Sequence, residues 1–168
     1  MALILVSIVL PALLALAAGY DLASYTIPNR IGLALVAAFF LFYAVSGQPL
    51  TFLGSHLAAF AVALAAGFAF FAARFIGGGD AKLFAATALW FGFSDLLAYT
   101  LVSALLGGGL TLAILMARRV PLPAGLVSQA WIVRLHDSKS GIPYGVALAA
   151  GALFVLSESH IFRLVVNA

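Results

Sequence analysis

The sequence predicts an all-α, polytopic membrane protein with about six transmembrane helices, formed as a single integral-membrane domain over residues 1–168. Of its 168 residues, 65% are hydrophobic and only 8% are charged, and the mean hydropathy is +1.22. A soluble domain carries roughly 25% charged residues, whereas a helical span needs about 20 mostly apolar residues to cross roughly 30 Å of hydrocarbon. Apolar stretches therefore fill nearly the whole chain and leave almost no extramembrane domain.

Turn signals divide the apolar sequence into six predicted spans. The first covers residues 2–20, and because no Lys or Arg precedes Arg30, we expect a retained span rather than a secretory signal. The others are expected from the end of "TIPNR" to Ser46, then at 52–74, Asp80 to Phe93, Leu96 to Met116 and Pro143 to Leu156. The fourth is short for a span unless it extends into the "GFSD" turn.

The basic residues are arranged by side of the membrane. With the N-terminus outside, the predicted cytoplasmic loops hold seven of the eight Lys and Arg residues: Arg30, Arg74, Lys82, Arg118, Arg119, Arg134 and Lys139. Only Arg163 falls outside, which is the positive-inside asymmetry that sets orientation. This asymmetry explains the basic pI without a nucleic-acid partner, since no dense basic patch with interleaved aromatic residues occurs. It also places Asp21 and Asp80 on the cytoplasmic side.

The longest loop, roughly residues 117–142, contains Val127, Trp131 and Leu135 at four-residue spacing. This spacing predicts a short interfacial helix anchored by Trp131, with an ordinary tethered loop as the alternative. Pro121 and Pro123 place the start of any such helix after them.

The chain has five carboxylates, and an acid within or at the edge of a membrane is costly enough to require an explanation. They are Asp21, Asp80, Asp95, Asp137 and Glu158. We interpret Asp95, in the outer "GFSD" turn, as a helix N-cap. Asp137 in the long loop and Glu158 beyond the last span are expected to be solvated. Asp21 and Asp80, at the cytoplasmic ends of the first and fourth spans, are the candidates for chemistry.

Two interpretations of Asp80, in "GGGDAKL", stay open. Asp is a favoured N-cap residue, although the capping box is incomplete because Leu83 occupies the third position after it. Three glycines are more than a cap requires, and they remove side chains from the approach to the carboxylate and let another backbone come close. They do not form a phosphate loop, since the terminal Gly-Lys-Ser/Thr is absent. A second triplet, Gly107–Gly109, is interpreted as close helix packing or a flexible point.

Asp21 is explained most simply as the polar residue that ends the first span. A carboxylate is disfavoured at a helix C-terminus and favoured at an N-terminus, so the helix ends are expected to make Asp80 the more readily ionised of the two. An aspartate pair needs this division, because one ionised carboxylate activates a water while the other, protonated, polarises the scissile carbonyl. Asp21 and Asp80 therefore form a candidate acid–base pair.

Other catalytic groups lack the required spacing. His56, His136 and His160 are scattered with no H-E-x-x-H pattern, and without cysteine there is no disulfide, thiol catalysis or cysteine-ligated metal. Ser55 is adjacent to His56, but neighbouring residues on a helix point apart. Lys82 is two positions from Asp80, hence on a different helical face, and is interpreted as an interface anchor.

These motifs resemble a known family. "GGGDAKL" contains the G-x-G-D signature of membrane aspartyl proteases at Gly77, Gly79 and Asp80. With Asp21 and the "IPN" of residues 27–29, the chain is similar to a type IV prepilin peptidase, and "IPYGVALAAG" at 142–151 is similar to that family's last span. The resemblance covers nearly the whole chain, in order and with the same span layout.

The resemblance implies an aspartic endopeptidase that removes the leader peptide of prepilin-like precursors at the cytoplasmic face of the inner membrane, without a metal or other cofactor. Asp21 and Asp80 would be the catalytic pair. The site-shaping residues would be Gly77, Gly78 and Gly79 at the approach, with Pro28 and Asn29 in the turn into the second span. The expected partners are a prepilin or pseudopilin substrate and the lipid bilayer.

The chain departs from the long members of that family, which begin with a cytoplasmic region carrying paired CxxC motifs associated with zinc and N-methylation. Methyltransferase activity is therefore not expected, and the chain resembles the short, peptidase-only form of Flp/Tad pilus systems. Archaeal preflagellin peptidases remain an alternative. A small proton- or cation-coupled transporter or channel subunit using Asp21 and Asp80 is the alternative from another class, although its acids would be expected deep in the spans. A purely structural scaffold would leave the glycines and the two same-side acids without a role.

Overall fold

The computed structural model describes residues 1–167, and every regular element in that range is a helix. The N-terminal helix is continuous through α1 (Ala2–Ile4), the π-helical turn η1 (Leu5–Val9) and α2 (Leu10–Ser24). It is followed by α3 (Asn29–Ser46), α4 (Leu50–Ala72) and α5 (Gly78–Ala117). The 3₁₀ turn η2 (Ala124–Leu126) then precedes α6 (Ala130–His136), α7 (Tyr144–Leu156) and α8 (His160–Val166).

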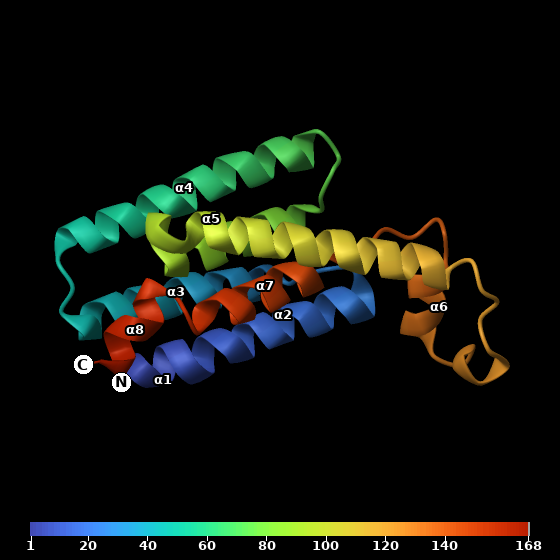
Figure 1. Ribbon diagram of the computed structural model, residues 1–168, viewed down its shortest axis with the longest axis horizontal. Coiled ribbons are helices and arrows are strands. Elements are labelled where there is room, and N and C mark those ends of the chain that lie inside the picture. The colour runs from blue at the N-terminus through green and yellow to red at the C-terminus, as the bar shows by residue number, and fades with distance from the viewer. Residues whose placement is uncertain (168) are drawn as a thin grey trace.

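The 40-residue helix α5 reverses direction at Gly92, whose φ of 61° and ψ of −172° interrupt it. This backbone conformation is essentially restricted to glycine. The rings of Phe84 and Tyr99 have centroids 5.4 Å apart, whereas a straight helix would separate these positions by about 22 Å. The two parts, here called the first arm (78–91) and the second arm (93–117), therefore form an antiparallel hairpin, which is visible as the turn in α5 in Figure 1.

The helical segments run back and forth, so the connections gather at two ends of the molecule (Figure 1). The end of α2, the connection from α4 to α5 and α6 lie at one end, here called the α6 end. The two termini, α8 and the connection from α3 to α4 lie at the opposite end. The seven cations predicted for one side all belong to elements or connections at the α6 end, while Arg163 lies in α8 at the other.

The predicted polytopic membrane fold is confirmed. Within the described residues, four helices are long and apolar enough to cross a membrane, Ala2–Ser24, Asn29–Ser46, Leu50–Ala72 and Gly78–Ala117, and α7 with α8, bent by 46°, would make a fifth. In this count α5 appears once although it reverses at Gly92. All six apolar segments predicted as spans are helical, with the fourth and fifth corresponding to the two arms of α5. The first helix continues to Ser24, past its predicted end at residue 20.

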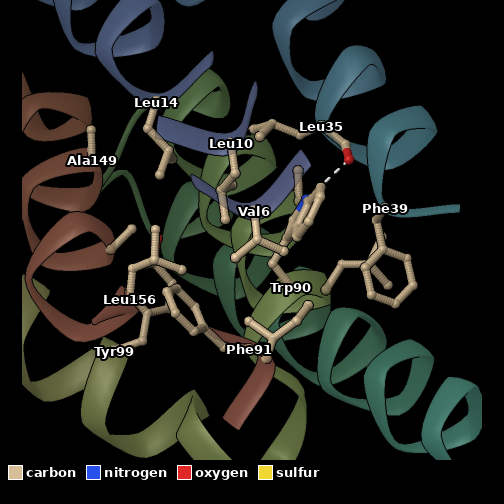
Figure 2. Close-up of a cluster of buried hydrophobic side chains, with 14 of the residues drawn as sticks. Val6, Leu10, Leu14, Leu35, Phe39, Trp90, Phe91, Tyr99, Ala149 and Leu156 are labelled. Carbon is tan, nitrogen blue, oxygen red and sulfur yellow. Dashed lines mark hydrogen bonds between the residues drawn. The ribbon is translucent and has the colours of Figure 1, made fainter. Parts of the chain in front are cut away.

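The core lies where the N-terminal helix, α3, the two arms of α5 and α7 meet, and Figure 2 shows Trp90 among these side chains. Val6, Leu10 and Leu14 from the N-terminal helix are fully buried there. Close van der Waals contact matters most in this core, because lipid is as apolar as the interior and gives little hydrophobic drive between helices. The indole nitrogen of Trp90 donates a hydrogen bond to the carbonyl oxygen of Leu35 at 3.0 Å, so this buried polar atom has a partner (Figure 2).

His56 stabilises the break in α5. Its Nδ1 lies 2.7 Å from the carbonyl oxygen of Leu89, just before Gly92. The ring is buried and stacks on Phe52 with a centroid distance of 3.9 Å. A carbonyl at the end of a helix lacks its intrahelical partner, so Nδ1–H of His56 satisfies it. His56 thus has a structural contact at the hairpin turn, away from Asp21 and Asp80.

Asp95 does not cap its own helix as predicted. Its Oδ2 accepts a hydrogen bond from the backbone N–H of His160 at 2.8 Å, at the start of α8. This hydrogen bond is a tertiary contact between two helices, because the turn at Gly92 brings the start of the second arm beside α8. Asp137 accepts the N–H of Lys139, and Glu158 forms an exposed ion pair with Arg163 at 2.8 Å.

The predicted loop helix forms as α6, after Pro121 and Pro123. Arg118 holds the loop against the bundle: its Nε donates to the carbonyl oxygen of Leu135 at 2.8 Å, and Nη2 donates to that of Gly141 at 3.0 Å. Arg134 in α6 donates to the carbonyl oxygen of Ala23, at the end of α2, at 2.9 Å. The loop is thereby tied to the end of the bundle where Asp21 lies.

Candidate active site

Asp21 and Asp80 border one cavity of about 290 Å³ at the α6 end. The cavity lies between the connection from α2 to α3 and the start of α5. Its other lining residues are Tyr25, Thr26, Ile27, Asn29, Gly77, Gly78, Gly79 and Lys82. Both side chains are buried, with exposed fractions of 4% for Asp21 and 8% for Asp80, and they are close enough for their charges to interact.

The start of α5 positions Asp80, but not in the way the sequence predicted. The helix begins at Gly78, so Asp80 is its third residue, and the N-cap is Gly77, with an extended backbone (φ −73°, ψ 152°). The Oδ2 atom of Asp80 accepts the backbone N–H of Gly77 at 3.1 Å, which is the bond that an acid at the third helical position makes to the N-cap. Asp80 therefore caps the helix from inside the first turn.

Each glycine of the triplet lies against a neighbour. A Cβ atom would lie 3.0 Å from Asp80 Oδ2 at Gly77, 3.3 Å from the Phe71 ring at Gly78, and 3.3 Å from Ile27 Cβ at Gly79. The backbone nitrogen of Ile27 is also only 3.4 Å from that position at Gly79. The close approach of a second backbone, expected from the glycines, takes place at Gly79, where the connection from α2 to α3 passes the start of α5.

Asp21 lies in the last turn of α2, which continues to Ser24 and ends at Tyr25 in the left-handed conformation (φ 55°). Its Oδ2 atom accepts the backbone N–H of Gly145 at 2.7 Å, in the first turn of α7. The N-terminus of α7 is thus directed at this carboxylate. The sequence argument considered only the end of Asp21's own helix, whereas in the structure two helix ends act on it.

Gly145 is a residue of the site that the sequence reasoning did not single out. A Cβ atom there would lie 2.8 Å from Asp21 Oδ2 and 2.7 Å from Ile27 Cδ1, distances that real Cβ atoms do not show. The lack of a side chain therefore allows the N–H of Gly145 to reach the carboxylate. "IPYGVALAAG" was singled out only as a span, and no local pattern in it identifies the partner of this N–H.

The second glycine triplet, Gly107–Gly109, contacts the start of α7. A Cβ atom at Gly107 would overlap the ring of Tyr144, the residue before Gly145, whereas Gly108 and Gly109 face open space. The prediction of close helix packing is confirmed for Gly107 alone. By receiving the ring of Tyr144, the second arm of α5 fixes the start of α7 beside Asp21.

Lys82 is exposed whereas Asp80 is buried, so the two residues lie on different faces of α5 as predicted, and the role of Lys82 as an interface anchor stays a prediction. Its Nζ donates a hydrogen bond to Oδ1 of Asn29 at 3.0 Å, and both residues line the cavity. Pro28 is the N-cap of α3 and Asn29 its first residue. The polar pair therefore joins the start of α3 to the start of α5.

Tyr25 also lines the cavity. Its hydroxyl is buried and has no hydrogen-bond partner among residues 1–167. Burial raises the pKa of the Tyr25 phenol, against an opposing effect of Arg118. The phenol of Tyr25 therefore stays neutral at physiological pH, so its hydroxyl keeps its proton.

The fold and the site together define a multi-pass α-helical membrane protein with a buried carboxylate pair at one end of its helices. The model of the type IV leader peptidase family matches residues 8–112, which is more than half of the chain. The chain belongs to this family. The matched segment contains Asp21 and Asp80, and it stops before Gly145. Searches of curated proteins and of solved structures found no match.

Proposed function

We propose that the protein is an aspartic endopeptidase that removes the leader peptide of type IV prepilin-like precursors at the cytoplasmic face of the inner membrane, with Asp21 and Asp80 as its catalytic pair. Membership of the leader peptidase family supports peptide hydrolysis. The observation that carries the proposal is that both carboxylates are buried on the wall of a single cavity. The cation-rich α6 end supports the cytoplasmic assignment.

In the proposed reaction, the ionised carboxylate takes a proton from a water molecule, whose oxygen attacks the scissile carbonyl carbon. The protonated carboxylate donates a hydrogen bond to the carbonyl oxygen and stabilises the charge that develops there. The C–N bond then breaks as the leaving amine receives a proton from the pair. The bonds from Gly77 and Gly145 hold the two carboxylates in place.

The kind of precursor that is cleaved is inferred from the sequence resemblance to type IV prepilin peptidases. The similarity to the short, peptidase-only form supports an Flp-type pilin precursor. A coupled transporter using the same two aspartates has less support, because a proton relay needs acidic side chains along the whole path across the membrane. The remaining carboxylates do not extend such a path from Asp21 and Asp80: Asp95, Asp137 and Glu158 bond to His160, Lys139 and Arg163, respectively.

The deciding experiment compares Asp21→Asn and Asp80→Asn with the wild type in cleavage of a co-expressed precursor. Asn keeps an oxygen that accepts the N–H of Gly145 or Gly77, so folding is expected to be retained. A general acid or base typically contributes a factor of about 10²–10⁴ to the rate, and each variant is expected to lose at least about 100-fold. Asp95→Asn is the matched control, because it keeps the acceptor for His160 and lies outside the cavity.

If either Asn variant accumulates in the membrane and processes the precursor at the wild-type rate, that aspartate is not catalytic. If Asp95→Asn is as inactive as the other two, the loss reports folding rather than chemistry.

A further inference from the structure

Arg118, the residue that follows the second arm of α5, joins three segments at the α6 end. Its Nε donates to the carbonyl oxygen of Leu135 at 2.8 Å, and its Nη2 donates to those of Ser140 and Gly141 at 3.1 and 3.0 Å. The phenol of Tyr25, the residue at which α2 ends, lies beside the same guanidinium. Arg118 therefore contacts the last turn of α6, the connection that leads into α7 and the end of α2.

The connection that Arg118 holds has no helical hydrogen bonds of its own. Residues 137–143, between α6 and α7, form no helix. A guanidinium presents five N–H donors in a fixed plane, and here it binds the consecutive carbonyl groups of Ser140 and Gly141. Gly141 is only four residues before Gly145, and Pro143, whose ring fixes φ, stiffens the chain between them. The bonds from Arg118 therefore help to set where the first turn of α7 lies.

The same group of contacts returns to α2 on both sides of Asp21. From α7, the N–H of Gly145 donates to Asp21 Oδ2 at 2.7 Å. From α6, Nη1 of Arg134 donates at 2.9 Å to the carbonyl oxygen of Ala23, two residues after Asp21. Both α6 and α7 are thus bonded to the last turns of α2. Arg118 links these two attachments, because it bonds to the end of α6 and to the connection before α7.

We propose that Arg118 is a positioning residue of the active site, which holds the start of α7 against the end of α2 so that Gly145 orients the carboxylate of Asp21. The inference rests on the proposed function, in which Asp21 belongs to the catalytic pair. Arg118 lies outside the set of residues that line the carboxylate cavity, so it acts through α7 and not on the substrate. Because a misplacement of about 1 Å can cost roughly 100-fold in rate, release of α7 is expected to lower kcat.

The competing explanation is that only the charge of Arg118 matters. A cation near the C-terminus of a helix interacts favourably with the helix dipole, and Arg118 directly follows α5. Lysine keeps this charge, but its single nitrogen cannot reproduce bonds that leave from both Nε and Nη2 of a planar fork. Arg118→Lys therefore separates the two explanations. Arg119 is the matched control position, because it carries the same charge and is exposed.

The first test measures kcat and KM on the precursor, per folded protein, for Arg118→Lys, Arg118→Gln and the same two changes at Arg119. We expect both Arg118 variants to lose at least about tenfold in kcat with KM nearly unchanged, and both Arg119 variants to match the wild type. Arg118→Lys, the milder change, carries the test if Arg118→Gln does not accumulate. Wild-type kcat in Arg118→Lys would overturn the inference, as would a loss confined to KM or an equal loss at Arg119.

The second test does not depend on turnover. Because the chain has no cysteine, the exposed residues Ala23 and Ser138 can be changed to cysteine to carry a pair of nitroxide labels, one on α2 and one in the connection before α7. Pulsed electron paramagnetic resonance in detergent measures the distance between the labels. Adding Arg118→Lys is expected to broaden or shift the distance distribution, and adding Arg119→Lys is expected to leave it unchanged.

The two tests together separate the inference from the proposed function. An unchanged distance distribution with Arg118→Lys would overturn the positioning role, even if kcat falls. Asp21→Asn, assayed beside these variants, tests the other level: if it cleaves the precursor at the wild-type rate, the proposed function fails. If Asp21→Asn is inactive while Arg118→Lys keeps the wild-type kcat, only the role of Arg118 is wrong.

Discussion

At the scale of single residues, the geometry around Asp21 depends on Gly145. This glycine supplies the N–H that the carboxylate accepts at 2.7 Å, and its missing side chain leaves the space that the bond needs. The bond comes from a helix distant in sequence, so the position of Asp21 depends on how α7 docks on α2. A change at Gly145 therefore acts on the proposed pair without removing either carboxylate.

Gly145→Ala is expected to lower activity while the chain remains folded. The added Cβ atom would lie 2.8 Å from Asp21 Oδ2 and 2.7 Å from Ile27 Cδ1, so α7, Ile27 or the carboxylate must shift. Overpacking of this kind costs about 1–3 kcal/mol. If that cost is added to the activation free energy of the reaction, the rate decreases roughly 5- to 150-fold. The measurement is kcat/KM on the precursor together with thermal unfolding in detergent.

Gly141→Ala is the control for this prediction, because a Cβ atom at Gly141, in the connection before α7, meets nothing within 4 Å. It is expected to behave as the wild type. Full activity of Gly145→Ala would show that the space around Asp21 is not critical for the reaction.

Local sequence located part of the site and not the rest, for a physical reason. The glycine triplet and the acid that follows it are contiguous, so their pattern indicated Asp80, and the cation distribution placed Asp21 at the same end. The bonds from Gly145 to Asp21 and from Lys82 to Asn29 cross between helices. Such contacts depend on which helix faces pack together, and the position of Lys82 along its own helix does not reveal its partner Asn29.

At the scale of elements, the reversal of α5 at Gly92 determines the layout of the site. The first arm carries Asp80 at its start, and the second arm returns to the same end of the molecule, where Gly107 receives the ring of Tyr144. Hydropathy and the "GFSD" turn were sufficient to predict two spans here. Neither could predict that His56 from α4 would satisfy the carbonyl of Leu89 at the turn, because that contact joins residues distant in sequence.

Gly92→Ala and His56→Ala are both expected to destabilise the hairpin. At Gly92, an alanine meets the unfavourable φ of 61° and a Cβ position 2.8 Å from His56 Nε2, which together cost about 1–3 kcal/mol. His56→Ala leaves the Leu89 carbonyl without its partner and a hole beside Phe52, at a cost of about 2–5 kcal/mol. Thermal unfolding in detergent measures both.

Gly54→Ala in α4 is the matched control for these two variants, since its Cβ position is open and its backbone helical. Alanine favours a helix over glycine by about 1 kcal/mol, so no loss of stability is expected. If Gly92→Ala unfolds at the same temperature as Gly54→Ala, the turn does not require glycine.

At the scale of the whole molecule, the alternating helices place the carboxylate cavity, the long loop and all the cations except Arg163 at the α6 end (Figure 1). The hydropathy of the sequence predicted this alternation, because each apolar segment must cross back before the next begins. Positive charge is retained on the cytoplasmic side of membranes. The site is therefore expected to face the cytoplasm, which is where an uncleaved leader would still be accessible.

The orientation can be measured directly, because the chain has no cysteine to remove first. Ser128→Cys reports the α6 end, in the loop between η2 and α6, and Ser157→Cys reports the opposite end, between α7 and α8; both serines are exposed. In spheroplasts treated with a membrane-impermeant maleimide, we expect labelling of Ser157→Cys alone. After permeabilisation, both should react, which controls for local reactivity of the thiols. If Ser128→Cys is labelled in intact spheroplasts and Ser157→Cys is not, the carboxylate cavity faces outward, and leader cleavage at the cytoplasmic face would have to be abandoned even if the aspartate pair proves catalytic.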